Sequence, residues 1–352
     1  MRIISNPMRR TGLPNGVLDD TPYPSLDVDK PNALLARCPA HNETPLLDMS
    51  DLAQKYGVSS ISLKDERERL NLGSFKALGA AYVIAHMASE QSSPISEISL
   101  KDTTFVTASA GNHGLSVARG AQIFGANAVI YIADTVPEDF AQRLRDGGAI
   151  VMRRGADYAA SMDAAALAAK ENGWTLLSDS SWEGYHDLPH RLMEGYLTLA
   201  DEVTHQIDAP PTHIFLQAGV GGMAGAVAAY FRKIWGDGPT IVVVEPDAAP
   251  ALLESINAQK PVTTEGPDSN MGRLDCKTPS FISLKGLAKD ADHFMLISDD
   301  DAIKAQKVLA DANCATSPSG IAGFAGFLEA QAELGIGEDA RILAIVSEVE
   351  IT

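Results

Sequence analysis

The sequence predicts an α/β fold in which parallel sheets are covered by helices and the chain forms two domains. Short β-type runs alternate with helical patterns from Ser60 to Glu171. The same alternation starts again after a helical pattern at residues 191–206 and ends with the apolar run 342–346. Strands that are separated by helices pair in parallel, so two such series predict two sheets. Ligands are expected at the carboxyl ends of these strands.

The individual elements follow from local periodicity. The helix expected at residues 75–88 places Ala77, Leu78, Ala81, Tyr82 and Ala85 on one face. The other expected helices are 114–124, 138–146, 158–171, 191–206 and 221–234, and the expected strands are 60–64, 104–107, 128–132, 149–152, 213–216, 240–244 and 342–346. Residues 1–45 are rich in proline and lack periodicity, which predicts an extended arm around the globular body.

Composition argues against several classes of protein. The chain has 352 residues, of which 45% are hydrophobic, and a formal net charge of −18. Such an acidic chain repels phosphate backbones and anionic membrane surfaces, so nucleic acids and membranes are not expected partners. The three cysteines show no disulfide or zinc-ligand spacing, the N-terminus lacks the apolar core of a signal peptide, and no apolar run reaches roughly 18 residues. These features predict a cytoplasmic protein without a metal site.

Three short motifs carry candidate chemistry. Ser74-Phe75-Lys76 places a lysine at the expected start of a helix, beside an aromatic ring. The loop Ser109-Ala110-Gly111-Asn112-His113 stands between a strand and a helix, where backbone N–H groups can bind a substrate carboxylate and the Asn112 amide can contact a ring hydroxyl. Gly219-Val220-Gly221-Gly222-Met223 opens a later helix and lets the backbone approach a phosphate. A Schiff-base lysine, an amide-bearing loop and a glycine-rich turn are what pyridoxal phosphate requires.

Each motif also has another interpretation. Lys76 taken alone is one of many surface lysines, and the loop 109–113 taken alone is an ordinary strand-to-helix turn. Gly219-x-Gly221-x-x-Ala224, with Glu245 at the end of the next strand, is similar to a dinucleotide fingerprint and would indicate a nicotinamide-dependent dehydrogenase. That alternative leaves Lys76 and the Asn112 loop without a role.

The segment from Asp179 to Tyr185 combines acidic and aromatic side chains in a short loop. A carboxylate there can neutralise a substrate ammonium group, and the alternative is a solvated linker that its aromatic residues anchor. Of the eight histidines, His113 lies in a candidate site, where it either contacts the substrate or packs against the loop.

With these motifs, the sequence is similar to the fold-type II pyridoxal-phosphate enzymes and, within them, to the 2,3-diaminopropionate ammonia-lyases. The general resemblance rests on Ser74-Phe75-Lys76 and on residues 109–113. The narrower one rests on residues 63–66, 75–79, 179–185, 216–225 and 244–247, and it spans residues 44–247 with weaker similarity to the end. It implies a fold like that of the tryptophan synthase β chain, with a large cofactor-binding domain at 1–90 and 180–352, a small α/β domain at 91–179, and a homodimer.

The resemblance also implies roles for individual residues. Lys76 holds the cofactor as a Schiff base and then removes the α-proton of an L-amino acid, while Asp179 orients the distal group of the substrate. Phe75 lies beside the ring, Asn112 contacts the ring hydroxyl, and Ser347 lies near the pyridine nitrogen. The remaining implied contacts are those of Gly219, Val220, Gly221, Gly222 and Met223 with the phosphate, and of Ser109, Ala110, Gly111, His113, Asp179 and Tyr185 with the substrate.

Three departures from the family pattern affect the expected chemistry. Ala110 stands where the ammonia-lyases have an aspartate associated with the D-isomer, and alanine takes no proton, so D-substrates are not expected to react. The loop is in this respect more similar to that of serine and threonine dehydratases. Arg273 and Asp275 replace small residues, and Arg273 either reads a second anionic group of the substrate or is an exposed loop residue. Residues 347–352 lack the glycine and aspartate that the family has there.

We therefore expect a pyridoxal-phosphate-dependent carbon–nitrogen lyase. It would perform α,β-elimination on a β-substituted L-amino acid such as 2,3-diaminopropionate and release a 2-oxo acid and ammonia. The alternatives are a serine/threonine- or hydroxyaspartate-type dehydratase, or another β-eliminating lyase on the same scaffold. Further alternatives are the nicotinamide-dependent dehydrogenase and a protein that binds an amino acid without turning it over.

Overall fold

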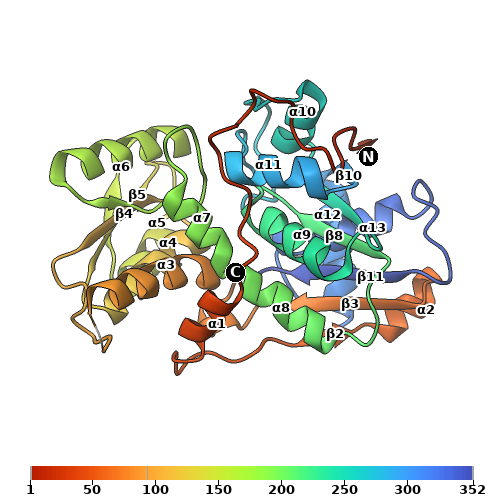
Figure 1. The fold of residues 1–352 in the computed structure, drawn as a ribbon, viewed down its shortest axis with the longest axis horizontal. Coiled ribbons are helices and arrows are strands. Elements are labelled where there is room, and N and C mark those ends of the chain that lie inside the picture. Colours follow the sequence, from red (N-terminus) through yellow and green to blue (C-terminus); the bar gives the residue numbers. More distant parts are fainter. Residues whose placement is uncertain (1, 93, 351–352) are drawn as a thin grey trace.

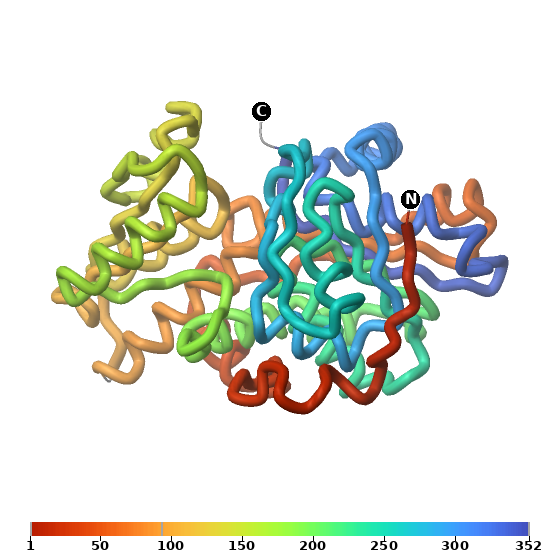
Figure 2. Tube along the Cα trace, turned by 90° about the horizontal axis from the view of Figure 1, so that it is seen from above, coloured from red at the N-terminus to blue at the C-terminus, as the bar shows by residue number. Residues whose placement is uncertain are grey.

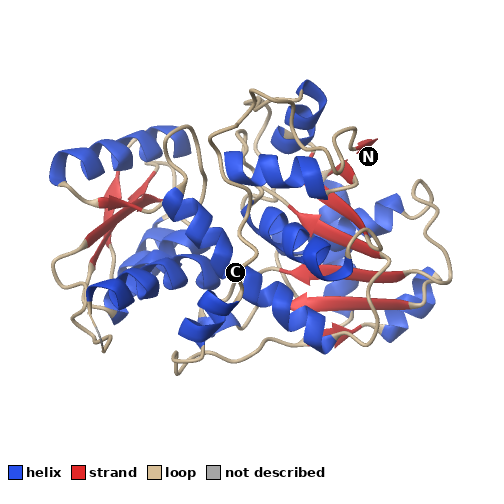
Figure 3. Ribbon diagram, viewed as in Figure 1, coloured by secondary structure: helices blue, strands red, loops and turns tan. Residues whose placement is uncertain are grey.

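Two β-sheets, each with its own helices, lie next to each other in the computed structural model, which describes residues 2–92 and 94–350 (Figure 1). The larger sheet has seven strands in the order β1-β10-β9-β8-β11-β3-β2, and the smaller has four in the order β6-β5-β4-β7. Figure 3 shows helices on both faces of each sheet. The expected α/β fold with helix-covered parallel sheets is confirmed, whereas the domain boundaries at 90/91 and 179/180 stay a prediction.

The larger sheet is parallel in its centre and antiparallel at its two edges. Its strands are β1 (Arg2–Ser5), β2 (Leu46–Asp48), β3 (Ser60–Asp65), β8 (His213–Gln217), β9 (Thr240–Pro246), β10 (His293–Ile297) and β11 (Arg341–Val346). Only the edge pairs β1–β10 and β2–β3 are antiparallel. In β9, Ile241 and Val243 pack with the cluster that includes helices α9 (Gly222–Trp235) and α11 (Phe281–Asp290). Val242 and Val244 pack on the opposite face, toward α12 (Asp299–Asp311) and α13 (Pro318–Ala330).

The smaller sheet is wholly parallel. Its strands are β4 (Thr104–Ala108), β5 (Asn127–Ile132), β6 (Ile150–Arg153) and β7 (Thr175–Leu176). Helices α3 (Lys76–Gln91), α4 (Asn112–Ile123) and α5 (Glu138–Asp146) contribute to the large apolar cluster with Phe105 and Ile130. Helix α6 (Tyr158–Asn172) covers the other face, where Ala165 and Ala169 pack on Val106. Alternation along β4 therefore separates the two helical layers.

Two expectations about local structure were wrong. The helical pattern at 191–206 is not one helix but two, α7 (Asp187–Gly195) and α8 (Leu197–Gln206). The two helices are separated at Tyr196. At the preceding residue, Gly195, an added Cβ would lie 2.4 Å from the carbonyl oxygen of Leu78. The close approach of α7 to α3 therefore requires a residue without a Cβ at position 195.

The arm at residues 1–45 is not wholly extended, because it contains β1 and the short helix α1 (Asp29–Leu35). It does pass along one edge of the larger unit, as the red segment in Figure 2 shows. Asn6 Nδ2 donates to the carbonyl oxygen of Ala291 at 2.7 Å, and Lys285 Nζ donates to that of Thr21 at 2.6 Å. These contacts hold the arm against α11. The remaining helices are α2 (Ser50–Tyr56) and α10 (Ala251–Ala258), with a short 3₁₀ turn at Arg69–Asn71.

A buried ion-pair cluster supports the turn that precedes Lys76. The Arg69 guanidinium donates to both Glu66 and Glu202, and Lys64 Nζ donates to Glu202 at 2.6 Å. Burial lowers the pKa of Lys64, but the two carboxylates compensate for its charge. A buried charge that keeps its hydrogen-bonded partners holds its segment in a single geometry. The cluster therefore anchors residues 66–72 just before α3 begins.

The carboxyl ends of β4, β8 and β11 lie around the space between the two units. The loops after them carry residues 109–111, 218–221 and 347–350, respectively. In parallel sheets, loops at these ends are where ligand sites form. Within the described part of the chain, no helix has both the length and the apolar character needed to cross a bilayer.

Candidate active site

A cavity of about 300 Å³ lies where these loops meet. Its wall contains the following predicted site residues: Phe75, Lys76, Ser109, Ala110, Gly111, Asn112, His113, Asp179, Gly219, Val220, Gly221, Gly222, Met223 and Ser347. The motifs are far apart in sequence, and the fold brings them to one place. The volume is at the lower end of the range of roughly 300–1,000 Å³ that is typical of small-ligand sites.

Lys76 is the first residue of α3, which directs its side chain into the cavity. Its Nζ lies 2.5 Å from Asp179 Oδ2 and 5.4 Å from the centre of the Phe75 ring. Burial on its own would lower the pKa of Lys76, but the attraction of the Asp179 carboxylate outweighs it and raises that pKa. In this state the lysine is a protonated ammonium ion held by its acid partner.

Asp179 is ionised in the same pair. Burial opposes its charge, yet the neighbouring Lys76 ammonium holds the pKa of Asp179 well below its usual range. His113 lies behind them, with its Nε2 at 2.8 Å from the carbonyl oxygen of Leu177. Burial lowers the pKa of His113, so the ring is neutral and packs against the loop.

The glycine-rich turn forms the opposite wall of the cavity. Gly221 has φ +93°, a left-handed conformation that glycine adopts without strain, and it caps the N-terminus of α9. At Gly219 an added Cβ would lie 2.9 Å from Cys276 Sγ. Bare backbone N–H groups at the start of a helix are suited to an anion. The residues present thus fit pyridoxal phosphate, with Lys76 for its aldehyde and this turn for its phosphate.

Replacing Gly221 by alanine is expected to destabilise the protein by about 1–2 kcal/mol and to weaken cofactor binding about tenfold. The new methyl group would be held at φ +93° and would lie 3.0 Å from Ser283 Cβ. Chemical unfolding and titration with the cofactor measure the two effects.

Gly173 offers a matched control. It also has positive φ (+68°), but an added Cβ would have no atom within 4 Å, and it ends α6 outside the cavity wall. Gly173→Ala should lose stability and keep its affinity for the cofactor. Equal cofactor affinity in the two variants would contradict the role of the turn.

The ring-binding side of the cavity contains Asn112, Ser347 and a residue that sequence reasoning missed. Glu348 is buried, and its Oε2 accepts a hydrogen bond from Asn112 Nδ2 at 2.6 Å. Its other oxygen accepts from Ser317 Oγ. A carboxylate directly after the buried strand β11 was the available signal. Glu348 fixes the direction in which the Asn112 amide points.

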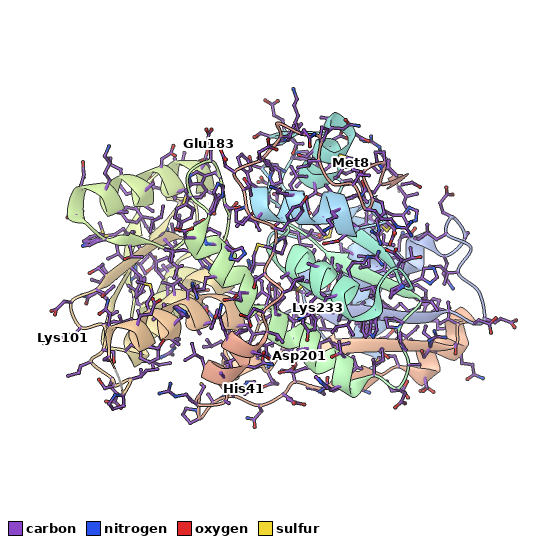
Figure 4. All side chains as sticks on the ribbon, viewed as in Figure 1. Met8, His41, Lys101, Glu183, Asp201 and Lys233 are labelled. Carbon is purple, nitrogen blue, oxygen red and sulfur yellow. The ribbon has the colours of Figure 1, made fainter. Side chains whose placement is uncertain are left out.

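Tyr185 is the one predicted site residue that does not line this cavity. Its hydroxyl donates to the carbonyl oxygen of Leu176 at 2.7 Å, and its ring stacks on Trp182 with the ring centres 4.3 Å apart. Glu183, between these aromatic residues, is exposed on the outer surface (Figure 4). The pair of rings instead anchors the loop that carries Asp179.

Several residues that sequence reasoning did not place in the site also line it. They include Phe140, Tyr158, Gln217, Arg273, Asp275, Cys276 and Glu348. Arg273 and Asp275 had been singled out as departures from the family, and the structure brings both to the cavity wall. Phe140 and Tyr158 come from α5 and α6 of the smaller unit, and nothing local in their sequence marks them.

Glu245 is not available to a dinucleotide ribose. Its side chain is fully buried and accepts the backbone N–H groups of Leu252 and Leu253 at 2.7 and 2.8 Å. Burial raises the pKa of Glu245 to about 8. The acidic residue of the apparent dinucleotide fingerprint therefore caps helix α10.

Comparison with known proteins agrees with this geometry. Residues 38–348 match the family described as pyridoxal-phosphate dependent enzyme. The chain is 34% identical to the diaminopropionate ammonia-lyase of Salmonella typhimurium over 311 residues, which cover 82% of this chain and 77% of the relative. It is 27% identical to the catabolic L-threonine dehydratase of Staphylococcus aureus over 311 residues, covering 88% of this chain and 84% of the relative.

The solved structure of the Escherichia coli diaminopropionate ammonia-lyase in complex with D-serine superposes with a TM-score of 0.89 at 28% identity. The superposition covers 99% of this chain and 94% of that one. The expected fold and cofactor are thereby confirmed, and the dinucleotide interpretation was wrong. The chain belongs to the family of pyridoxal-phosphate dependent enzymes, within its ammonia-lyase group.

Proposed function

We propose that this enzyme converts an L-amino acid of the 2,3-diaminopropionate type into a 2-oxo acid and ammonia by α,β-elimination. The observation that carries the proposal is the Lys76–Asp179 pair, at 2.5 Å, inside a cavity lined by the Asn112 loop and the glycine-rich turn. With 2,3-diaminopropionate, the Cα–H and Cβ–N bonds break, water is consumed, and one pyruvate and two ammonia molecules result.

Lys76 and Asp179 have different roles in this proposal: Lys76 moves the Cα proton, and Asp179 binds the leaving group. When bound, pyridoxal phosphate delocalises the electron pair left at Cα. Lys76 removes the Cα proton, for which its Nζ must first lose the proton it carries in the pair with Asp179. Asp179 stays ionised and lies beside the amine, where its carboxylate can hold the β-ammonium group of the substrate.

The Ser109–His113 loop binds the α-carboxylate in this proposal. Gly111 is the N-cap of α4 and has no side chain to cap the helix, so the first N–H groups of the helix are free for an anion. Asn112, oriented by Glu348, and Ser347 are the residues that would hold the ring hydroxyl and the pyridine nitrogen. A hydroxyl partner for that nitrogen suits elimination, since it makes the ring a moderate electron sink.

The test is release of 2-oxo acid from L- and D-2,3-diaminopropionate, measured in parallel with the cofactor-loaded enzyme. Turnover of the L-isomer alone is expected. If neither isomer reacts but L-serine or L-threonine does, the enzyme is a dehydratase, which the loop with Ala110 favours as the second candidate. If the protein binds these amino acids and turns over none of them, it is a binding protein and the proposal is wrong.

Replacing Ala110 by aspartate is expected to introduce turnover of the D-isomer while L-turnover changes little. Ala110 lines the cavity and has no group that takes a proton, whereas a carboxylate at this position can act as a base on the other face of the substrate. Ala110→Asn is the matched control, because it has the same shape without the basic group. Equal D-turnover in the two variants would contradict the assignment.

We also propose that the enzyme is a cytoplasmic homodimer, as the resemblance implies. Sedimentation equilibrium of the cofactor-loaded protein tests the assembly, and a monomer at micromolar concentration would overturn it.

A further inference from the structure

Arg273 lies in the wall of the cavity on a loop that is held in place at several points. Its backbone N–H donates to Ser319 Oγ at 3.1 Å. Further along the loop, Lys277 Nζ donates to Asp275 at 2.5 Å and to the carbonyl oxygen of Ala248 at 2.8 Å. An added Cβ at Gly219 would lie 3.2 Å from the Arg273 carbonyl oxygen, so the loop packs directly on the glycine-rich turn. These contacts therefore fix the position of Arg273 at the cavity wall.

The Arg273 side chain has hydrogen-bonding capacity that the described residues leave unused. Its Nε is buried and has no hydrogen-bond partner among them. The nearest carboxylate oxygen, Glu348 Oε2, is 3.7 Å from Nε, which is too far for a hydrogen bond. The guanidinium carbon lies 5.7 Å from the centre of the Phe140 ring. Stacking on an aromatic face leaves the edge of the planar group free for a carboxylate.

Arg273 borders the loop that is proposed to bind the α-carboxylate. An added Cβ at Gly111 would lie 3.4 Å from Arg273 Nε. A second cation, Arg143 of α5, lies nearby. Burial and the positive charge of Arg273 both lower the pKa of Arg143. The loop already provides backbone N–H groups for one carboxylate, so the positive charge of Arg273 in the cavity wall exceeds what a single α-carboxylate requires.

Glu348 offsets part of this charge through a long ion pair with Arg273 at 3.7 Å. It gives the guanidinium no hydrogen bond, because its oxygens already accept hydrogen bonds from Asn112 and Ser317. Lys76 and Asp179 compensate each other. A partly buried guanidinium without a hydrogen-bonded anion is unfavourable, and a ligand that supplies the anion relieves that cost.

We propose that Arg273 is a specificity-determining residue that binds a second acidic group of the substrate. The preferred substrates are L-amino acids that carry a carboxylate on Cβ together with the leaving group. This inference rests on the proposed β-elimination. For 2,3-diaminosuccinate, the Cα–H and Cβ–N bonds break, one water is consumed, and oxaloacetate and two ammonia molecules form. For 3-hydroxyaspartate, the water that leaves balances the water of hydrolysis, and oxaloacetate and one ammonia form.

Two matched substrate pairs test the inference on the cofactor-loaded enzyme. 2,3-Diaminosuccinate differs from 2,3-diaminopropionate, and 3-hydroxyaspartate from serine, only by the Cβ carboxylate. The wild-type enzyme is expected to prefer the carboxylated member of the pair that it turns over. Arg273→Ala should lower kcat/KM for that member by about 10- to 100-fold, mainly through KM, and change the other member by less than about threefold.

Arg119→Ala is the control, because Arg119 lies on α4 outside the cavity wall, where its guanidinium donates to Gln122. Arg119→Ala should leave kcat/KM unchanged for both members of the substrate pair. An equal loss of kcat/KM for both members of the pair in Arg273→Ala would show that Arg273 binds the α-carboxylate. No loss for either member would show that Arg273 is an exposed loop residue. Either result overturns the inference.

A binding measurement separates failure of this inference from failure of the proposed elimination. L-aspartate and L-alanine are compared as ligands through their effect on the visible absorption band of the cofactor-loaded protein. Aspartate is expected to bind at least about tenfold more tightly to the wild type, and Arg273→Ala should remove that preference. If none of the four substrates reacts but this preference is present and lost in the variant, the elimination is wrong and the acidic subsite stands. Absence of the preference overturns the subsite.

Discussion

Lys76→Ala is expected to remove the visible absorption band of the cofactor-loaded protein and to lower turnover by about 10³-fold or more. In the structure Lys76 directs an amine into the cavity, next to Phe75 and the Asn112 loop. Alanine can neither bind an aldehyde covalently nor move the Cα proton. Absorption spectra and 2-oxo acid release measure the two losses separately.

Lys101→Ala is the matched control for this variant. Lys101 is exposed on the outer edge of the smaller unit (Figure 4) and is not part of the cavity wall. Its replacement should leave both spectrum and turnover intact. The assignment would fail if Lys76→Ala kept the band and the activity.

Asp179→Asn is expected to lower kcat/KM by about 100-fold and, in the protein without cofactor, to shift the reaction of Lys76 with pyridoxal phosphate to lower pH. The direction of this pH shift follows from the ion pair between Lys76 and Asp179. The Asp179 carboxylate raises the pKa of Lys76 against the effect of burial. Without it, burial lowers that pKa, so more of the neutral, reactive amine is present near neutral pH. The rate of band formation against pH measures the shift.

Glu183→Gln is the control, because Glu183 belongs to the same loop but is exposed (Figure 4). It should keep the wild-type pH profile. A profile for Asp179→Asn that coincides with the wild type, or that moves to higher pH, would contradict the coupling between Asp179 and Lys76.

The predictions that succeeded rest on local patterns. Helix α9 follows a strand through a glycine turn, and the continuous apolar run 241–244 in β9 marks a strand buried on both faces. The lysine motif, the Asn112 loop and the glycine turn could each be recognised because their chemistry is contained in a few consecutive residues. The break between α7 and α8 at Tyr196 was not recognised, because residues 191–206 form one continuous helical pattern in the sequence.

The site residues that escaped prediction are those whose role depends on neighbours distant in sequence. Glu348 acts on Asn112, which lies 236 residues earlier in the chain. Tyr185 had been expected to contact the substrate, but its hydroxyl is bonded to the backbone of Leu176. Glu245 completed an apparent fingerprint, yet its carboxylate caps α10.

The sequence by itself therefore determined the fold class and the cofactor, and it predicted most of the residues that the structure gathers around one cavity, because periodicity and short motifs are local properties. Only the tertiary structure decided that Asp179 pairs with Lys76 and that Arg273 lines the cavity instead of facing solvent. The Asp179–Lys76 pair and the place of Arg273 arise when loops from two sheets converge. Burial among particular neighbours then determines the charge, the direction and the exposure of each side chain. Contacts of this kind are absent from any single stretch of sequence.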